Sequence, residues 1–143
     1  MKELTEIDKA WSAAFIDGEG CITCYKRSDN CDSCVGVVYA SQSKSAMIDK
    51  LIQVTGLGNC LIKKDKYGGC FCWQVKSLKA LDFLTAIEPY LILKKEQANL
   101  IIKLIRTQNL LRQSVGTVNC GGIWQFEIYN KIRRLNKTRE RQT

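Results

Sequence analysis

The stretch Ala13-Ala14-Phe15-Ile16-Asp17-Gly18-Glu19-Gly20 ends an apolar helical segment on two acidic residues, each followed by glycine. The last turn of a helix carries about half a negative charge on its unpaired carbonyls, so each acid there costs roughly 0.3–1 kcal/mol unless a cation compensates. Glycine has no Cβ atom, so it lets the chain leave the helix and lets a partner approach the main chain. The stretch therefore predicts a functional helix end, with a carbonyl beside a carboxylate.

Oxygen ligands of this kind suit a hard divalent cation such as Mg²⁺, which keeps several waters and takes one or two carboxylates plus substrate phosphates. The Glu19 carboxylate and the Gly18 carbonyl are the candidate ligands. Upstream, Ala13 and Ala14 give the helix small side chains on which a second helix can approach closely. Two such helices side by side would present two acids.

This stretch resembles the LAGLIDADG motif of the homing endonucleases, with Ser12 at the first Leu of the motif, Ala14 at its first Gly and Glu19 at its last Asp. Residues 87–100, which lead from Pro89 through Lys94 into a helical pattern, are similar to a segment of the single-motif branch, which carries a catalytic lysine in this loop. With residues 51–58, similar to the exit of the family's second helix, the resemblance spans about residues 5–107. For the eight motif residues taken alone, a buried amphipathic helix with a glycine C-cap is the alternative.

The resemblance implies a site-specific, intron-encoded double-strand DNA endonuclease that hydrolyses phosphodiester bonds with Mg²⁺ or Mn²⁺, with Ca²⁺ as a non-catalytic substitute. It implies that Glu19 and Gly18 hold the metal ions, where they stabilise the attacking water and the leaving oxygen. It implies further that Gln42 positions water, that Lys94 stabilises charge on the phosphate or perturbs the solvent network, and that Lys44 fills a second basic position. Because Lys94 lies in the loop after Leu93, we expect its side chain to be free to reach the phosphate near Glu19.

The order of predicted elements is α-ββ-α-ββ-α, an α+β architecture with a four-stranded antiparallel sheet and helices on one face. Thr5-Glu6-Ile7-Asp8 is typical of a capping box at the start of the first helix. The turn at Asp65-Lys66-Tyr67-Gly68-Gly69 indicates a second hairpin. The expected helices are 5–17, 45–55, a segment from Ser77 to before Pro89, 95–107 and 123–135, and the expected strands are 21–27, 35–41, 60–64 and 71–76.

The face of the sheet that the helices leave free is expected to contact the DNA. Side chains alternate along a strand, so Thr23, Tyr25 and Arg27 share one face, as do Tyr39 and Ser41. A two-stranded ribbon fits the major groove. In the last strand we assign the aromatic set with Trp73 to the core, so the remaining predicted DNA contacts are Lys63, Lys64, Lys66, Gln74 and Lys76.

The chain carries one motif, although a duplex must be cut on both strands. We therefore expect a homodimer with a two-fold axis between the two motif helices, and Ala13, Ala14 and Asp17 at the interface.

Length and composition agree with one intracellular domain over residues 1–143, in a prokaryotic cytoplasm or an organelle. No run approaches the ~20 apolar residues of a membrane span, and the N-terminus does not have the pattern of a signal peptide. The net charge is +8, and from Arg106 onward eight Lys or Arg stand against Glu127 and Glu140. Such an excess favours a polyanion such as double-stranded DNA, although the tail from about residue 135 fits a solvated, frayed basic end equally well.

The eight cysteines allow three interpretations. Free small hydrophobes are the default inside cells. Cys21-x2-Cys24 and Cys31-x2-Cys34 match a zinc site by count, but residues three apart on a strand face opposite ways. In a hairpin turning at residues 27–28, Cys24 would lie opposite Cys31 and Cys21 opposite Cys34, within plausible disulfide geometry.

The absence of histidine excludes His-based triads and a His general base. Three functions stay open: an endonuclease, an intron RNA maturase on the same fold, and a DNA-binding regulator that does not cleave. The combination of Glu19, Gln42 and Lys94 favours the endonuclease, because a protein that only binds needs none of them.

Overall fold

A computed structural model describes residues 1–29, 31–64, 69–115 and 122–140. Its first helix, α1, spans Glu6–Glu19 and begins with the predicted capping box. The Asp8 amide donates to Thr5 Oγ1 at 3.2 Å, and the Thr5 amide donates to Asp8 Oδ2 at 3.2 Å. Each side chain thus satisfies a main-chain donor that the first turn of a helix leaves unpaired.

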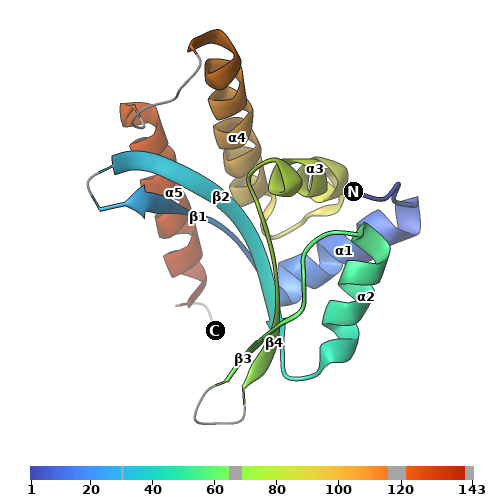
Figure 1. Cartoon of the computed structure of the whole chain (residues 1–143). Helices are drawn as coiled ribbons and strands as arrows, with labels where there is room; N and C mark the ends of the chain where they lie inside the picture. The colour runs from blue at the N-terminus through green and yellow to red at the C-terminus, as the bar shows by residue number, and fades with distance from the viewer. Residues whose placement is uncertain (30, 65–68, 116–121, 141–143) are drawn as a thin grey trace.

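The predicted order of elements is confirmed, with two strands after each of the first two helices (Figure 1). Several elements are longer than predicted, among them the second strand and the fourth helix, whereas the third strand is shorter than the predicted 60–64. After α1 the chain forms β1 (Gly20–Ser28), β2 (Cys31–Gln42), α2 (Ser45–Thr55), β3 (Leu61–Lys63), β4 (Cys70–Lys76), α3 (Ser77–Ile87), a 3-10 turn η1 (Glu88–Tyr90), α4 (Lys95–Val115) and α5 (Ile123–Glu140).

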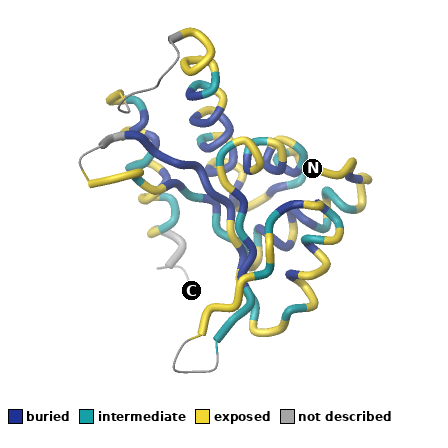
Figure 2. Tube along the Cα trace, in the orientation of Figure 1, coloured by how far each residue is buried: buried dark blue, intermediate teal, exposed yellow. Residues whose placement is uncertain are grey.

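The four strands form one antiparallel sheet in the order β1-β2-β4-β3. Figure 1 shows the sheet as a curved ribbon with α1, α2 and α3 on one side of it. Ile22, Val38, Trp73 and Val75 point to that side and are almost fully buried. Trp73 meets Phe83 of α3 edge to face, with ring centroids 5.1 Å apart. The assignment of the aromatic set of β4 to the core is therefore confirmed, and Figure 2 shows burial concentrated along β2 and on the inner faces of the helices.

Helix α4 lies close to β2 because Gly36 has no side chain. A Cβ atom at Gly36 would lie 2.9 Å from Ile101 Cγ2 and 3.0 Å from Ile105 Cδ1. Both isoleucines are buried, so neither side chain has free space to move into.

Buried amides join α4 and α5 to the same strand. Gln125 of α5 accepts a hydrogen bond from the Cys34 amide at 3.0 Å, and Gln108 of α4 donates to the Cys34 carbonyl at 2.7 Å and to Gln125 Oε1 at 2.9 Å. Two helices are thus fixed to β2 through the main chain of one residue. Hydrophobic periodicity, from which the helices and strands are predicted, carries no signal for this polar contact.

The predicted cysteine pairings are wrong. In the structure Cys24 lies opposite Gly36 and Cys21 opposite Tyr39, because β2 begins at Cys31 and the hairpin turns later than residues 27–28. Among the described side chains six cysteines are free thiols, namely Cys21, Cys24, Cys34, Cys60, Cys70 and Cys72. Within the described ranges no cluster of three or more Cys, Asp or Glu side chains could hold a metal ion. The zinc interpretation also needs the side chain of Cys31, which lies outside the described side chains.

Candidate active site and nucleic-acid interface

The end of α1 is shaped by a close main-chain contact. The Gly20 amide donates to the carbonyl of Ile16, and a Cβ atom at Gly20 would lie only 2.9 Å from Ile16 Cα and Ile16 O. Only glycine fits this exit from the helix into β1. Glu19 and Gly18, one and two residues before Gly20, are both exposed at the helix end. The carboxylate and the carbonyl singled out from the sequence are therefore open to an approaching ligand.

Asp17 binds the loop that precedes α4. Its Oδ2 atom accepts hydrogen bonds from the amides of Ile92 at 2.7 Å and Leu93 at 3.1 Å, and its Oδ1 atom accepts one from the amide of Lys94 at 2.8 Å. A carboxylate that accepts three main-chain donors just before a helix satisfies donors that would otherwise lack partners. Asp17, expected at a dimer interface, thus has a clear structural role inside its own chain.

The side chain of Lys94, in this loop, binds the end of α1. Its Nζ atom donates to the carbonyl of Ile16 at 2.8 Å and to the carbonyl of Asp17, and the residue is only 8% exposed. The expectation of a lysine free to reach a phosphate is therefore wrong in its geometry. The ammonium group lies at the negative end of α1, where a cation is favourable. The Lys94 ammonium group therefore compensates the negative charge at the acidic end of α1.

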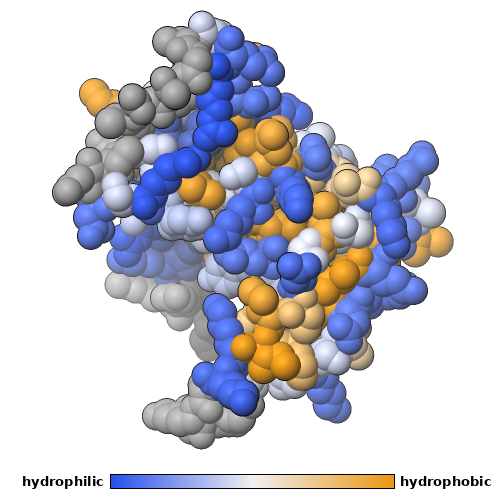
Figure 3. Space-filling model, viewed as in Figure 1, coloured by the Kyte–Doolittle hydropathy of each residue, from blue (hydrophilic) through white to orange (hydrophobic). Residues whose placement is uncertain are grey.

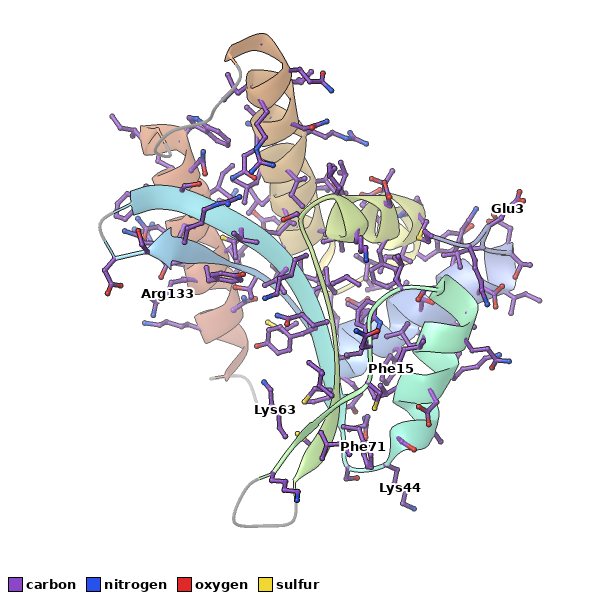
Figure 4. All side chains as sticks on the ribbon, in the orientation of Figure 1. Glu3, Phe15, Lys44, Lys63, Phe71 and Arg133 are labelled. Carbon is purple, nitrogen blue, oxygen red and sulfur yellow. The ribbon has the colours of Figure 1, made fainter. Side chains whose placement is uncertain are left out.

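The other candidate catalytic residues lie at the same end of the sheet as Glu19. Gly20 is paired with Ala40, so the end of α1 and the end of β2 lie side by side. Gln42, the last residue of β2, is half-buried there, and Lys44 is exposed at the N-terminus of α2. Figure 4 shows Lys44 and Lys63 at one end of the molecule, on different elements. Three segments thus end or begin at this end of the sheet: α1 ends at Glu19, β2 ends at Gln42, and α2 starts after Lys44.

The exposed side of α1 carries small and apolar residues. Ile7 is 81% exposed, and Ala10, Ala14 and Gly18 are exposed on the following turns. Ala13, by contrast, is fully buried in the core of its own chain. Its expected place at a dimer interface is therefore corrected: it faces the sheet, one position away from the exposed stripe.

The register of the sheet brings the predicted DNA contacts onto its open face. Tyr39 lies between Cys21 and Gln74 on the neighbouring strands, and Val37 lies between Thr23 and Lys76. Residues directly opposite one another share a face. The Lys76 ammonium lies 5.2 Å from the centroid of the Tyr25 ring, so a basic and an aromatic side chain lie together on this face.

The remaining predicted contacts lie at the edges of this face. Arg27 is exposed beside the register shift at the end of β1. Ser41 and Lys63 line a hollow of about 270 Å³ together with Tyr39 and Gln74. Lys64 is exposed next to Lys63, whereas Lys66 falls outside the described residues. Figure 3 shows apolar side chains over the middle of the viewed face and hydrophilic ones around them.

Tyr39 presents a neutral hydroxyl at the centre of the open face. Its hydrogen bond with the Cys21 thiol, together with partial burial, raises the pKa of Tyr39 to about 12. The hydroxyl therefore remains protonated at neutral pH and can donate a hydrogen bond to a base edge or a phosphate.

Part of the basic charge of α5 serves the fold itself. Arg133, labelled in Figure 4, donates to the Tyr129 hydroxyl at 3.0 Å, and Lys131 forms a 2.8 Å ion pair with Glu96 of α4. Lys26 of β1 lies 4.9 Å from the centroid of the Phe126 ring. The Arg133 contact lies within α5, whereas the contacts of Lys131 and Phe126 tie α5 to α4 and β1. The charge excess of α5 is therefore only partly available to a polyanion. No helix within the described ranges is long and apolar enough to cross a membrane.

Neither protein-family models nor curated proteins give a match to this chain. Several solved structures do match this chain. The homing endonuclease I-CvuI, in complex with its target, matches with a TM-score of 0.57 and 23% identity over 91% of this chain and 95% of its own. The homing endonuclease I-TnaI matches with a TM-score of 0.57 and 18% identity over 98% and 99%. The I-SmaMI LAGLIDADG homing endonuclease, bound to cleaved DNA, matches with a TM-score of 0.56 and 19% identity over 94% of this chain but 44% of its own.

I-CvuI and I-TnaI are thus matched almost from end to end, whereas I-SmaMI is matched over less than half of its length. The chain has the fold of the LAGLIDADG homing endonucleases.

Proposed function

We propose that this protein is a site-specific endonuclease that cuts double-stranded DNA with a divalent metal ion and acts as a homodimer. The observation that carries the proposal is the position of Glu19. It is exposed at the end of α1, beside the exposed Gly18 and next to the end of β2. A protein that only binds DNA has no need for a carboxylate there, since it would repel the phosphates.

Assembly of two copies would complete the site. One chain supplies one exposed acid at this helix end, and its described residues hold no cluster of three or more metal-binding side chains. The exposed stripe of Ile7, Ala10 and Ala14 would let a second α1 approach closely and hide the apolar Ile7 side chain. An isologous contact of this kind sets the two Glu19 side chains near the two-fold axis.

The donor set fits Mg²⁺ or Mn²⁺, because Glu19 and the Gly18 carbonyl offer only oxygen atoms. Such an ion, when bound, stabilises charge on the attacking and leaving oxygens of the phosphodiester. Gln42 would orient the water from the end of β2, and Lys44 would add positive charge from the start of α2. Lys94 would act as a positioning residue, because its ammonium group holds the two carbonyls that precede Gly18.

The open face of the sheet would read the DNA. Thr23, Tyr25, Tyr39, Gln74 and Lys76 share that face, so they would reach one groove together. Amide and basic side chains can hydrogen-bond purine edges in the major groove, and the lysines would also contact phosphates.

The test compares Glu19→Gln with Glu3→Gln. Glu3 is also exposed, and Figure 4 shows it at the far end of the N-terminal segment, away from Lys44. Binding to a pool of random duplexes selects the target, and cleavage of that target is then measured with Mg²⁺. We expect Glu19→Gln to bind but to lose cleavage by two or more orders of magnitude, roughly the effect of removing a key charged group, and Glu3→Gln to behave as the wild type.

Cleavage by Glu19→Gln at the wild-type rate would refute the assignment. Binding without cleavage by the wild-type protein would favour the DNA-binding regulator. Preference for a structured intron RNA over every duplex would favour the maturase.

A further inference from the structure

Two thiols lie next to each other on the open face of the sheet. The Sγ atoms of Cys70 and Cys72 are 3.5 Å apart on β4. The two residues are two positions apart on a strand, so their side chains point the same way, and Phe71 between them is packed against the core on the opposite side. Cys70 is half-buried, so a small molecule can reach it.

The surroundings of the pair belong to the proposed DNA-binding face. Cys70 is paired with Lys63 of β3, and Cys72 lies between Ser41 of β2 and Leu61 of β3. Both thiols line the hollow of about 270 Å³ that Tyr39 and Lys63 also line. Figure 4 labels Lys63 and Phe71, which mark this end of the sheet.

We propose that Cys70 and Cys72 form an oxidation-sensitive pair, which a low-molecular-weight disulfide such as oxidised glutathione converts into an intramolecular disulfide, and that this bond weakens DNA binding by the open face. The second half rests on the proposed function.

The chemistry is thiol–disulfide exchange. The Cys70 thiolate attacks one sulfur of oxidised glutathione, a mixed disulfide forms, and one glutathione thiolate leaves and takes up a proton. Cys72 then loses its proton and attacks the Cys70 sulfur, and the second glutathione leaves as its thiol. The protein dithiol is oxidised by two electrons and oxidised glutathione is reduced by the same two.

The order of attack follows from accessibility. Cys72 is 7% exposed, and burial together with the neighbouring Cys70 thiol raises the pKa of Cys72. The less exposed thiol with the raised pKa is the poorer first nucleophile, so Cys70 takes that step and Cys72 resolves the mixed disulfide.

The resulting bond would be strained and therefore reversible. Two residues along a strand span roughly 6.6 Å between Cα atoms, near the upper end of the ~4.4–6.8 Å range of disulfides. Drawing the sulfurs from 3.5 Å to about 2.05 Å would bend β4 where it pairs with β3. The hairpin strand that carries Lys63 would move with it. Strained disulfides are the labile, regulatory ones.

A second thiol pair, Cys24 and Cys34, is less accessible to solvent than Cys70 and Cys72. Cys24 and Cys34 share a hydrogen bond on the helix-covered side of the sheet, and this bond and burial raise the pKa of Cys24. Cys34 has no exposed surface and Cys24 is only 5% exposed. A dissolved disulfide cannot reach them without unfolding the sheet, so we expect oxidation to be selective for the pair on the open face.

The experiment treats the reduced full-length chain with oxidised glutathione, maps disulfides by mass spectrometry of peptides, and measures the affinity for a selected duplex by fluorescence anisotropy. Cys70→Ser and Cys72→Ser are the test variants. Cys21→Ser is the matched control, because Cys21 is also half-buried and lies on the same face beside Tyr39. A reducing agent is then added to test whether the disulfide is broken and the affinity recovers.

We expect a Cys70–Cys72 disulfide in the wild type and in Cys21→Ser, with affinity about tenfold weaker, the scale of one lost specific contact, and full recovery on reduction. Cys70→Ser should keep its affinity on oxidation, because the first attack is lost. Cys72→Ser should stop at the mixed disulfide between Cys70 and glutathione, which the peptide map identifies and which should also weaken binding, because a bulky anionic group then stays on the open face. Persistence of both thiols, or a disulfide through other cysteines, would overturn the site itself. A Cys70–Cys72 disulfide with unchanged affinity would overturn its effect on DNA binding. Failure of the reduced protein to bind any duplex would instead refute the proposed function. The peptide map would still show whether the Cys70–Cys72 disulfide forms.

Discussion

Replacing Lys94 by Met tests whether its ammonium group holds the end of α1. The substitution removes two hydrogen bonds from a charged donor, to the carbonyls of Ile16 and Asp17, from a residue that is 8% exposed. Such bonds are worth about 1.5–3 kcal/mol each. Ile16 O keeps a second donor, the Gly20 amide, and burying Met avoids desolvating a charge. We therefore expect a net loss of about 2–4 kcal/mol, which corresponds to roughly 5–15 °C in Tm for a chain of this size.

Thermal and urea unfolding measure this loss, and Lys95→Met is the matched control. Lys95 is the next residue, but its side chain is 48% exposed and forms only a 3.6 Å ion pair with Glu88, a kind of contact worth at most about 1 kcal/mol. Single-turnover cleavage, measured well below both Tm values, should fall for Lys94→Met and stay near wild type for Lys95→Met. Equal stability of Lys94→Met and the wild type would refute the argument that Lys94 holds the helix end.

Three further predictions concern the interface, the packing of α4 and the first helix cap. Ala14→Leu, on the exposed stripe of α1, should give monomers or aggregates in light scattering, and a tight, active dimer would exclude this interface. Gly36→Ala should lower the free energy of unfolding by about 1–3 kcal/mol, because the new methyl group meets buried Ile101, and urea denaturation measures it. The hydrogen bond from Thr5 lowers the pKa of Asp8 below its ordinary value of 3.8, so the stability from this carboxylate is present above pH 3.8 and lost as the pH falls through the lowered pKa. Unfolding measured from pH 6 to pH 2 should therefore show a smaller acid loss in Asp8→Asn.

Local chemistry made much of the fold predictable. A capping box depends on residues three apart, so Thr5 and Asp8 define the start of α1 without any tertiary contact. Alternation of side chains placed Thr23 and Tyr25 on one face of β1, because a strand has a period of two wherever it lies.

The register of the first hairpin was beyond local reasoning. Turns of different lengths are all compatible with the polar residues after Arg27, and each length pairs Cys21 and Cys24 with different partners. The choice is made by which strand residues become buried under the helices, a property of the whole sheet. In the same way, adjacent Ala13 and Ala14 differ only in the direction of a methyl group, which packing decides.

The acidic helix end, its glycines and the order of the elements follow from the amino-acid sequence alone, because these features depend on neighbours along the chain. The group that compensates the acidic helix end follows only from the tertiary fold. Asp17 and Lys94 are 77 positions apart, and the residues around them do not indicate that the loop before α4 contacts the end of α1. Packing of the helices on one sheet brings them together, and the buried carbonyls of α1 then direct the ammonium group of Lys94 inward, since an unpaired charge cannot remain buried.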